Sequence, residues 1–157
     1  MRFVLLSLCM LSSISTSLAD VLQDQRGIYK SVNLVQFVNK NQLSTQMAEK
    51  KQRLMIQPEP IQFQAQLMSM PKAGKFSLAY DALQLWQSES ELPTIDHSAF
   101  VGLQEGPVLG VYVTHEAAKM LRQINLEVPT QFYAMHIYNY SKGPRLVIVA
   151  AQEKPQD

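Results

Sequence analysis

Three histidines have the widest chemical range in this chain, because imidazole can bind a metal, move a proton or activate a nucleophile. They stand at positions 97, 115 and 136. His115-Glu116 resembles the start of a zinc-protease helix motif, but Lys119 occupies the place of the second histidine. The sequence therefore predicts no metal site. It favours a solvated helix start at His115 and a hydrogen-bonded structural role for His136.

Asp96-His97-Ser98 places the three residue types of a catalytic triad side by side. In triads these groups converge from separate segments, and we expect adjacent residues to be unable to reach one another in the required order. The sequence also lacks the Gly-x-Ser-x-Gly elbow that carries many serine nucleophiles. Carboxylates at Glu89, Glu91 and Asp96 could serve glycoside hydrolysis, but solvated loop charges are the commoner outcome. We therefore expect no catalytic residue, and we favour a protein that is not an enzyme.

Glycines at 102, 106 and 110 are evenly spaced, but the lysine and hydroxyl of a phosphate-binding loop are missing. We therefore expect these glycines to lie in turns and at strand ends, and not in a phosphate-binding loop. The sequence predicts no cofactor and no cofactor-binding residue. Asn139-Tyr140-Ser141 fits the glycosylation pattern, which matters only in a eukaryotic secretory pathway.

Residues 1–19 have the pattern of a cleavable signal peptide, with Arg2, the apolar run Phe3–Met10 and small residues up to Ala19. The run is shorter than the roughly 20 apolar residues of a membrane span, so we expect no transmembrane anchor after processing. Cys9 lies inside the run and follows Leu8, which does not fit a lipoprotein signal. The expected mature chain is 20–157, in the periplasm or secreted.

Such a mature chain contains no cysteine, so disulfides, thiolate metal sites and cysteine nucleophiles are all excluded. Loss of Arg2 leaves 13 basic residues against 13 acidic ones. Nucleic acid is therefore not an expected partner, because phosphate binding requires an excess of basic residues.

The elements that would position these groups form one domain after a flexible arm at about 20–30. Residues 31–55 permit either a helix or a strand, with a helix favoured over 43–54 and ended by the prolines of 57–60. The expected elements that follow are a strand over 61–68, a helix over 76–86, a long irregular connection over 88–107, a strand over 108–113, a helix over 117–124, and a hairpin of strands 130–140 and 145–151.

This order predicts an α+β fold: a mainly antiparallel sheet of about four strands, two or three helices packed on it, and a C-terminal β-hairpin. The hairpin has few polar residues on either face, so we expect both of its faces to be covered.

By exclusion, the expected function is a non-enzymatic exported protein-interaction domain. It would be an accessory of an envelope-associated assembly, with a protein partner or self-association. Two alternatives stay open: a small secreted hydrolase using the 88–107 segment, and a small-ligand binder using Trp86 and the tyrosines of 133–140.

Overall fold

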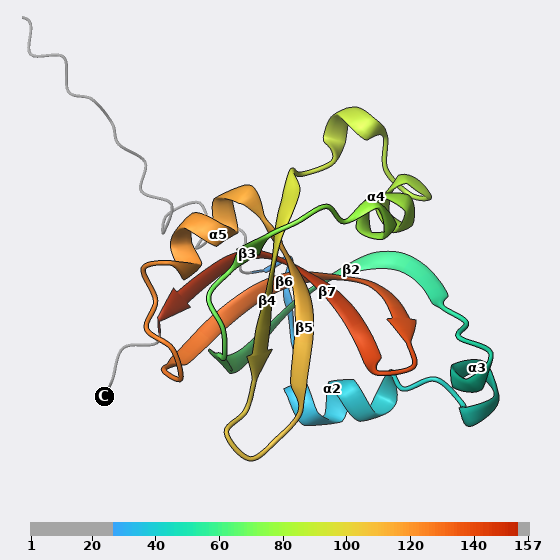
Figure 1. Ribbon diagram of the computed structural model, residues 1–157, viewed down its shortest axis with the longest axis horizontal. Coiled ribbons are helices and arrows are strands. Elements are labelled where there is room, and N and C mark those ends of the chain that lie inside the picture. The colour runs from blue at the N-terminus through green and yellow to red at the C-terminus, as the bar shows by residue number, and fades with distance from the viewer. Residues whose placement is uncertain (1–26, 154–157) are drawn as a thin grey trace, which may run out of the picture.

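The computed structural model describes residues 27–153 (Figure 1). The expected signal peptide, Cys9 and most of the expected N-terminal arm lie outside these residues. In chain order the elements are β1 (Lys30–Ser31), α2 (Leu34–Lys40), α3 (Thr45–Glu49), β2 (Leu54–Leu67), β3 (Lys72–Ala73), α4 (Ser77–Gln84), the short 3-10 helix η1 (Glu89–Glu91), β4 (Ile95–Gly102), β5 (Val108–Thr114), α5 (His115–Leu121), β6 (Pro129–Tyr140) and β7 (Gly143–Glu153).

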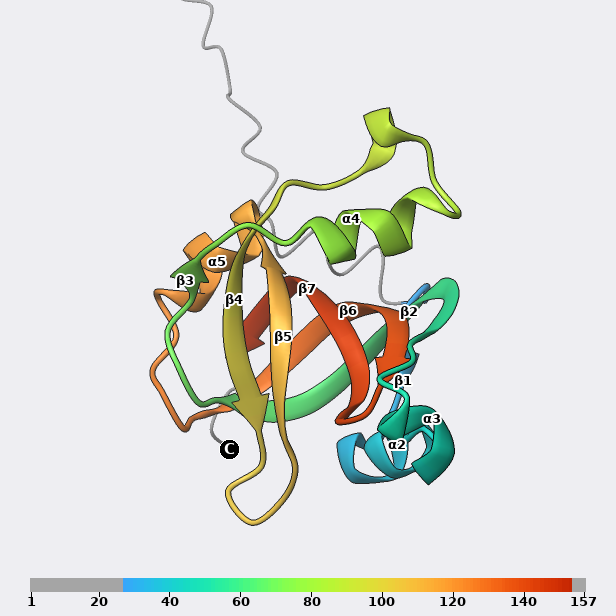
Figure 2. The same ribbon diagram turned by 45° about the vertical axis from the view of Figure 1, so that its right-hand side comes forward.

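Five long strands close into a barrel, seen from two directions in Figures 1 and 2. The neighbours run β2-β6-β7-β5-β4, and β2 also pairs with β4 through Gln66↔Gly102 and Leu67↔Val101, which joins the two ends of the row. All of these pairings are antiparallel except β5–β7. The two-residue strands β1 and β3 add to the edges of β2 and β4.

Taken as strands one to five, β2, β4, β5, β6 and β7 have the pairing order of the five-stranded Greek-key barrel known as the OB-fold. A helix, α5, connects the third and fourth of these strands. This likeness concerns the path of the chain, and it does not by itself name a ligand.

The barrel interior is filled by alternate, inward-facing residues, as the period of two along a strand requires. Phe63 and Phe132 stack at its centre with their rings 5.6 Å apart. The apolar sides of α2 and α5 lie at opposite ends of the barrel (Figure 2) and join the same core. A second cluster lies outside the barrel, where α4 packs over β5, β6 and β7.

Two polar residues start the end helices. The Asn33 side chain accepts a hydrogen bond from the Gln36 amide and caps α2, and Thr114 Oγ1 accepts one from the Ala117 amide and caps α5. Within residues 27–153, no helix combines the length and apolar character that crossing a bilayer demands.

The predicted fold class is wrong: the described residues form a mixed sheet of seven strands with four α-helices, where a mainly antiparallel sheet of about four strands with two or three helices was expected. Two of the additional strands have two residues each and therefore show no periodicity. The parallel β5–β7 pairing joins segments that are not neighbours in the chain, so no local pattern indicates it.

The expected irregular connection over 88–107 is also wrong, because it contains β4. The expected helix over 43–54 is shorter in the structure, where α3 covers only Thr45–Glu49. The strand β2 begins at Leu54 and continues through Pro58 and Pro60. A register shift between Met55 and Glu59 accommodates Pro58, and Pro60 follows it opposite Met135.

The prediction that the C-terminal hairpin is covered on both faces is confirmed. Leu146 and Ile148 face the barrel interior, while Val147 and Ile137 lie in the cluster beneath α4. The covering elements belong to the same chain, so this hairpin needs no partner to bury its side chains.

Candidate functional site

A β-bulge at the start of β4 turns two residues that are adjacent in the sequence, Asp96 and His97, toward the same helix. Ile95 pairs with Thr114 and His97 pairs with Val113, which leaves Asp96 as the extra residue. A bulge breaks the strand's alternation and redirects side chains. Asp96 and His97 consequently both turn toward α5 and contact each other, but the other nitrogen of His97 faces Arg122 and not Ser98.

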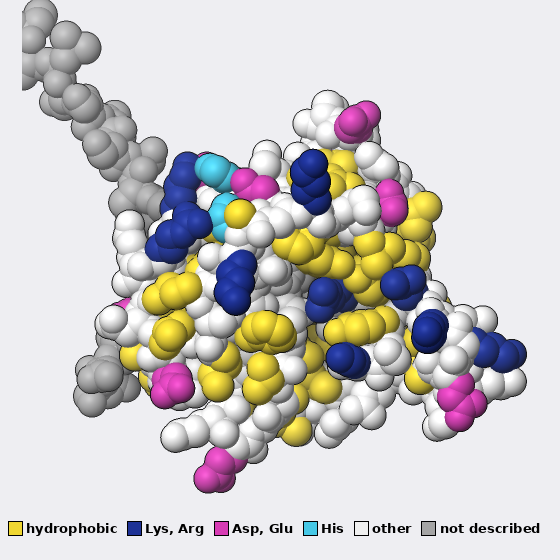
Figure 3. All heavy atoms as spheres, in the orientation of Figure 1, with side chains coloured by type: hydrophobic (Ala, Val, Ile, Leu, Met, Phe, Trp, Pro, Cys, Tyr) yellow, Lys and Arg dark blue, Asp and Glu magenta, His cyan; other side chains and the backbone are white. Residues whose placement is uncertain are grey.

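A chain of hydrogen bonds connects four side chains here. Asp96 Oδ1 accepts from His97 Nδ1 at 2.5 Å, and Asp96 Oδ2 accepts from His115 Nδ1 at 2.7 Å. On the other side of His97, Arg122 Nη2 lies 2.8 Å from His97 Nε2. We call these four residues the Asp96 cluster. Figure 3 shows histidine side chains at the surface, next to acidic and basic groups.

The hydrogen bond from Arg122 determines which ring nitrogen of His97 carries the proton. A guanidinium can only donate hydrogen bonds, so His97 Nε2 must accept and its proton must lie on Nδ1, where it is donated to Asp96. His97 is buried, whereas Asp96 and His115 are partly open to solvent. Both ring nitrogens of His97 therefore have hydrogen-bond partners, so neither is free to accept a hydrogen bond from the serine hydroxyl of a catalytic triad.

Helix α5 positions the two outer members of the cluster. His115 is its first residue and Arg122 follows its last, seven positions later, so the two lie on the same side two turns apart. The opposite side of α5, with Ala117 and Leu121, is buried in the barrel. Packing of α5 against the core thus sets the distance of both side chains from β4.

The pKa of Asp96 is lowered, mainly by the hydrogen bond from His115 and then by His97. Its carboxylate is therefore ionised at neutral pH and presents negative charge to both imidazoles. Next to the cluster, Lys119 Nζ donates to Glu116 Oε1 at 2.9 Å with both side chains exposed. The expected solvated helix start is found, since His115 is half exposed, but His115 also bonds to Asp96.

Two other predicted carboxylates take no part in the cluster. Glu91 belongs to η1, and its carboxylate accepts from the Ser88 amide in a capping box. Glu89 lies in the same short helix.

His136 is separated from the cluster and has the predicted structural role. Its Nε2 lies 2.7 Å from Asn139 Oδ1, and the amide of Asn139 donates to Asn41 Oδ1. These bonds tie β6 to the end of α2. Asn139 is buried with both ends of its amide bonded, so the folded protein does not expose it as a glycosylation acceptor.

The folded protein is expected to lose stability through His136 as the pH falls below about 6.5. Burial lowers the pKa of His136, so the unfolded chain takes up a proton at a higher pH than the folded protein does. In a His136→Gln variant, the Gln amide can still donate to Asn139, and the free energy of unfolding should fall less steeply with decreasing pH. Urea unfolding of both proteins at several pH values measures this. Equal declines would mean that another group is responsible.

The outward surface of β4 and β5 carries exposed apolar side chains. Phe100 and Val108 are 55% and 51% exposed, and the pairs Phe100↔Gly110 and Gly102↔Val108 put them on the same face. We call this surface, with Arg145 beside it, the β4–β5 outer face. Figure 3 shows hydrophobic side chains with Lys and Arg among them over these strands.

Arg145 joins β7 to β5 at one side of this face. Its Nη1 donates to the Gly110 carbonyl at 2.6 Å, and its guanidinium lies 4.5 Å from the centre of the Tyr112 ring and 5.4 Å from that of Tyr140. A Cβ on Gly110 would stand 3.0 Å from that Nη1 and 3.4 Å from the Phe100 ring. The absence of a side chain at Gly110 therefore lets Phe100 and Arg145 lie close together.

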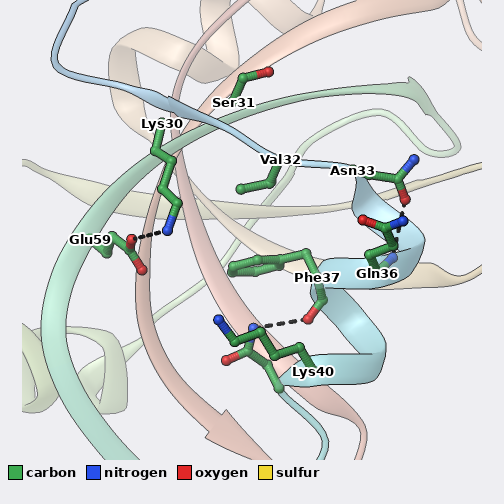
Figure 4. Close-up of a pocket in the computed structure, with 9 residues that line it drawn as sticks. Lys30, Ser31, Val32, Asn33, Gln36, Phe37, Lys40 and Glu59 are labelled. Atoms are coloured by element: carbon green, nitrogen blue, oxygen red, sulfur yellow. Dashed lines mark hydrogen bonds and ion pairs between the residues drawn. The ribbon is translucent and has the colours of Figure 1, made fainter.

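Two open cavities border the segment that joins β1 to α2. One of about 270 Å³ is lined by polar and charged side chains, including the exposed ion pair of Lys30 and Glu59 (Figure 4). The other, of about 380 Å³, lies between this segment and residues including Phe63 and Gln131. Neither is lined by a residue of the Asp96 cluster.

The aromatic residues expected to form a ligand pocket do not gather around either cavity. Trp86 lies beyond the end of α4 and is half exposed. Tyr133 contacts Tyr29, and the Tyr138 hydroxyl lies 2.9 Å from that of Tyr112. Burial, together with that hydrogen bond, raises the pKa of Tyr138. These tyrosines therefore serve the packing of the barrel wall.

Comparison with known proteins gives no relative: no family model, no curated protein and no solved structure matches this chain.

Proposed function

We propose that this chain is a non-enzymatic, exported protein-interaction domain that uses the β4–β5 outer face to contact its partner. One observation carries the proposal: Phe100 and Val108 are neighbours on one face, and each exposes about half of its apolar surface. Single exposed apolar residues are ordinary, but adjacent ones on a flat strand surface favour a contact site.

The composition of the surroundings supports a protein partner. Aromatic and arginine side chains are enriched in the centres of protein interfaces, and Phe100 lies near Arg145. Arg145 is held by Gly110, Tyr112 and Tyr140, so little side-chain freedom remains to be lost on binding.

The signal-peptide pattern supports a periplasmic or secreted location, so we expect the partner in the cell envelope, with this protein as an accessory of a larger assembly. The hydrolase alternative has less support, because Arg122 occupies the nitrogen of His97 that a triad would use.

Site-specific photocrosslinking in the native envelope tests the proposal. A photoreactive amino acid at position 100 or 108 is expected to give a discrete crosslinked product. The same amino acid at Leu85, which is 62% exposed near the end of α4, should not give that product. The mass of the product distinguishes a second copy of this chain from a different protein. Absence of a product at both strand positions, or equal products at all three, would contradict the proposed surface.

A further inference from the structure

We propose that Asp96, His97 and His115 bind a divalent transition-metal ion, a property independent of the β4–β5 outer face. One ligand atom from each of the three residues lies within 4.8 Å of the others. The two imidazoles present Nδ1 to opposite oxygens of the same carboxylate. Three ligand atoms of metal-binding type thus converge on one place.

The bulge in β4 and the start of α5 supply what the sequence spacing lacks. Consecutive residues in a regular strand point to opposite faces, but the bulge turns both Asp96 and His97 toward α5. His115 arrives from the adjacent strand end, since Thr114 pairs with Ile95. The three ligands are therefore close in space without any recognisable motif.

Coordination requires only modest side-chain movement. Zinc binds histidine nitrogen and carboxylate oxygen at roughly 2.0–2.2 Å, so the ion would replace the protons now shared between Asp96 and each imidazole. Asp96 and His115 are partly exposed and can rotate, while buried His97 stays fixed. With three protein ligands, water completes the coordination.

The ligand set indicates the class of metal. Two imidazole nitrogens and one carboxylate suit zinc, copper, nickel or iron, whereas calcium and magnesium prefer oxygen ligands. The Asp96 carboxylate lies between the two imidazoles and adds negative charge at the same point. Metal and protons compete for the same atoms, so binding weakens in acid.

Arg122 opposes this binding. When a metal occupies Nδ1 of His97, the single proton of the neutral ring must move from Nδ1 to Nε2, where it faces the guanidinium, so two donors oppose one another. Arg122 is exposed at the end of α5 and can move away into water. It therefore lowers the affinity of the site without blocking it.

Calorimetric titration of the untagged chain with Zn²⁺ tests the assignment. One ion per chain is expected at micromolar affinity, weakened by at least about tenfold in Asp96→Asn and in His115→Gln. Glu116→Gln is the matched control, since it removes an exposed carboxylate beside His115 that is not a ligand. Its affinity should equal that of the wild type. Thermal melts of each variant confirm that it is folded, and exposed His115 is the safer substitution.

Three results would overturn the site: no stoichiometric binding by the wild type, unchanged affinity in folded His115→Gln, or equal weakening in Glu116→Gln. A fourth variant tests the ligand atom on His97. Arg122→Gln removes the charge and supplies an amide oxygen that can accept from Nε2, so it should bind Zn²⁺ more tightly than the wild type. Weaker binding would contradict coordination through Nδ1 of His97.

Discussion

An Ile148→Asp variant is expected to be largely unfolded under conditions in which the wild-type protein is folded. Ile148 has no exposed surface and lies in the barrel interior, where an unpaired carboxylate finds no water and no cation. The cost is several kcal/mol, comparable to the whole stability of many small domains. Circular dichroism and urea unfolding of the purified variant measure the loss.

Neighbouring positions on the same strand provide the controls. Val147→Asp should be nearly as damaging, because Val147 is buried in the separate cluster beneath α4. Val149 is only partly buried, and it has no partner on β6 because the pairing shifts from Tyr133↔Ala150 to Ala134↔Ile148. Val149→Asp should therefore lower the free energy of unfolding by less than the other two variants do. Wild-type stability in Ile148→Asp would show that the barrel interior is open to water.

A Phe63→Ala variant is expected to lose about 3–5 kcal/mol of unfolding free energy. The Phe63 ring is 1% exposed and stacks on Phe132 in the barrel centre, so its removal leaves a cavity that surrounding strands cannot close. Chemical denaturation of wild type and variant gives the difference directly.

Phe100→Ala is the matched control, since it deletes the same side chain from the outside of the barrel. Phe100 is 55% exposed, and its removal should change stability by no more than about 0.5 kcal/mol. The same variant should lose the proposed partner contact. If Phe100→Ala destabilised the protein as strongly as Phe63→Ala, the outer ring would be part of the core and unsuited to binding.

The elements that the sequence predicted well are those whose packing gives a regular pattern. The strand Val108–Thr114, the helix α5 and the C-terminal hairpin each combine a clear period with a capping or turn residue at a boundary. The alternation of residues 61–67 likewise falls inside β2. Local pattern sufficed there, because these segments have one consistent inner face.

Prediction failed where tertiary pairing overrides local signals. Pro58 and Pro60 indicate a chain break, yet the pairing with β6 carries the strand through them with a register shift. β4 was interpreted as a loop because the bulge at Asp96 interrupts its alternation and glycine ends it. Closure of the barrel depends on contacts between distant segments, which a local pattern does not record.

The Asp96 cluster was missed for the same reason. Asp96, His97 and His115 were each recognised as candidates, but spacing gave no reason to join them. The bulge and the pairing of β4 with β5 join them. Arg122 carried no signal at all, since a basic residue at a helix end is ordinary. His136, by contrast, was assigned its structural role from its place on an aromatic strand.

The closure of β2 onto β6 also determines the order in which this molecule can assemble. During synthesis β2 is complete long before β6 exists, and pairings between such distant segments, as in Ile61↔Ala134, form slowly because a long loop must close first. Until then β2 is an unpartnered strand with an apolar face, the kind of segment that aggregates. Pro58 and Pro60 lack the amide protons that a foreign strand would use. The two prolines that hide the first part of this strand from prediction can therefore protect the nascent chain from pairing with its neighbours.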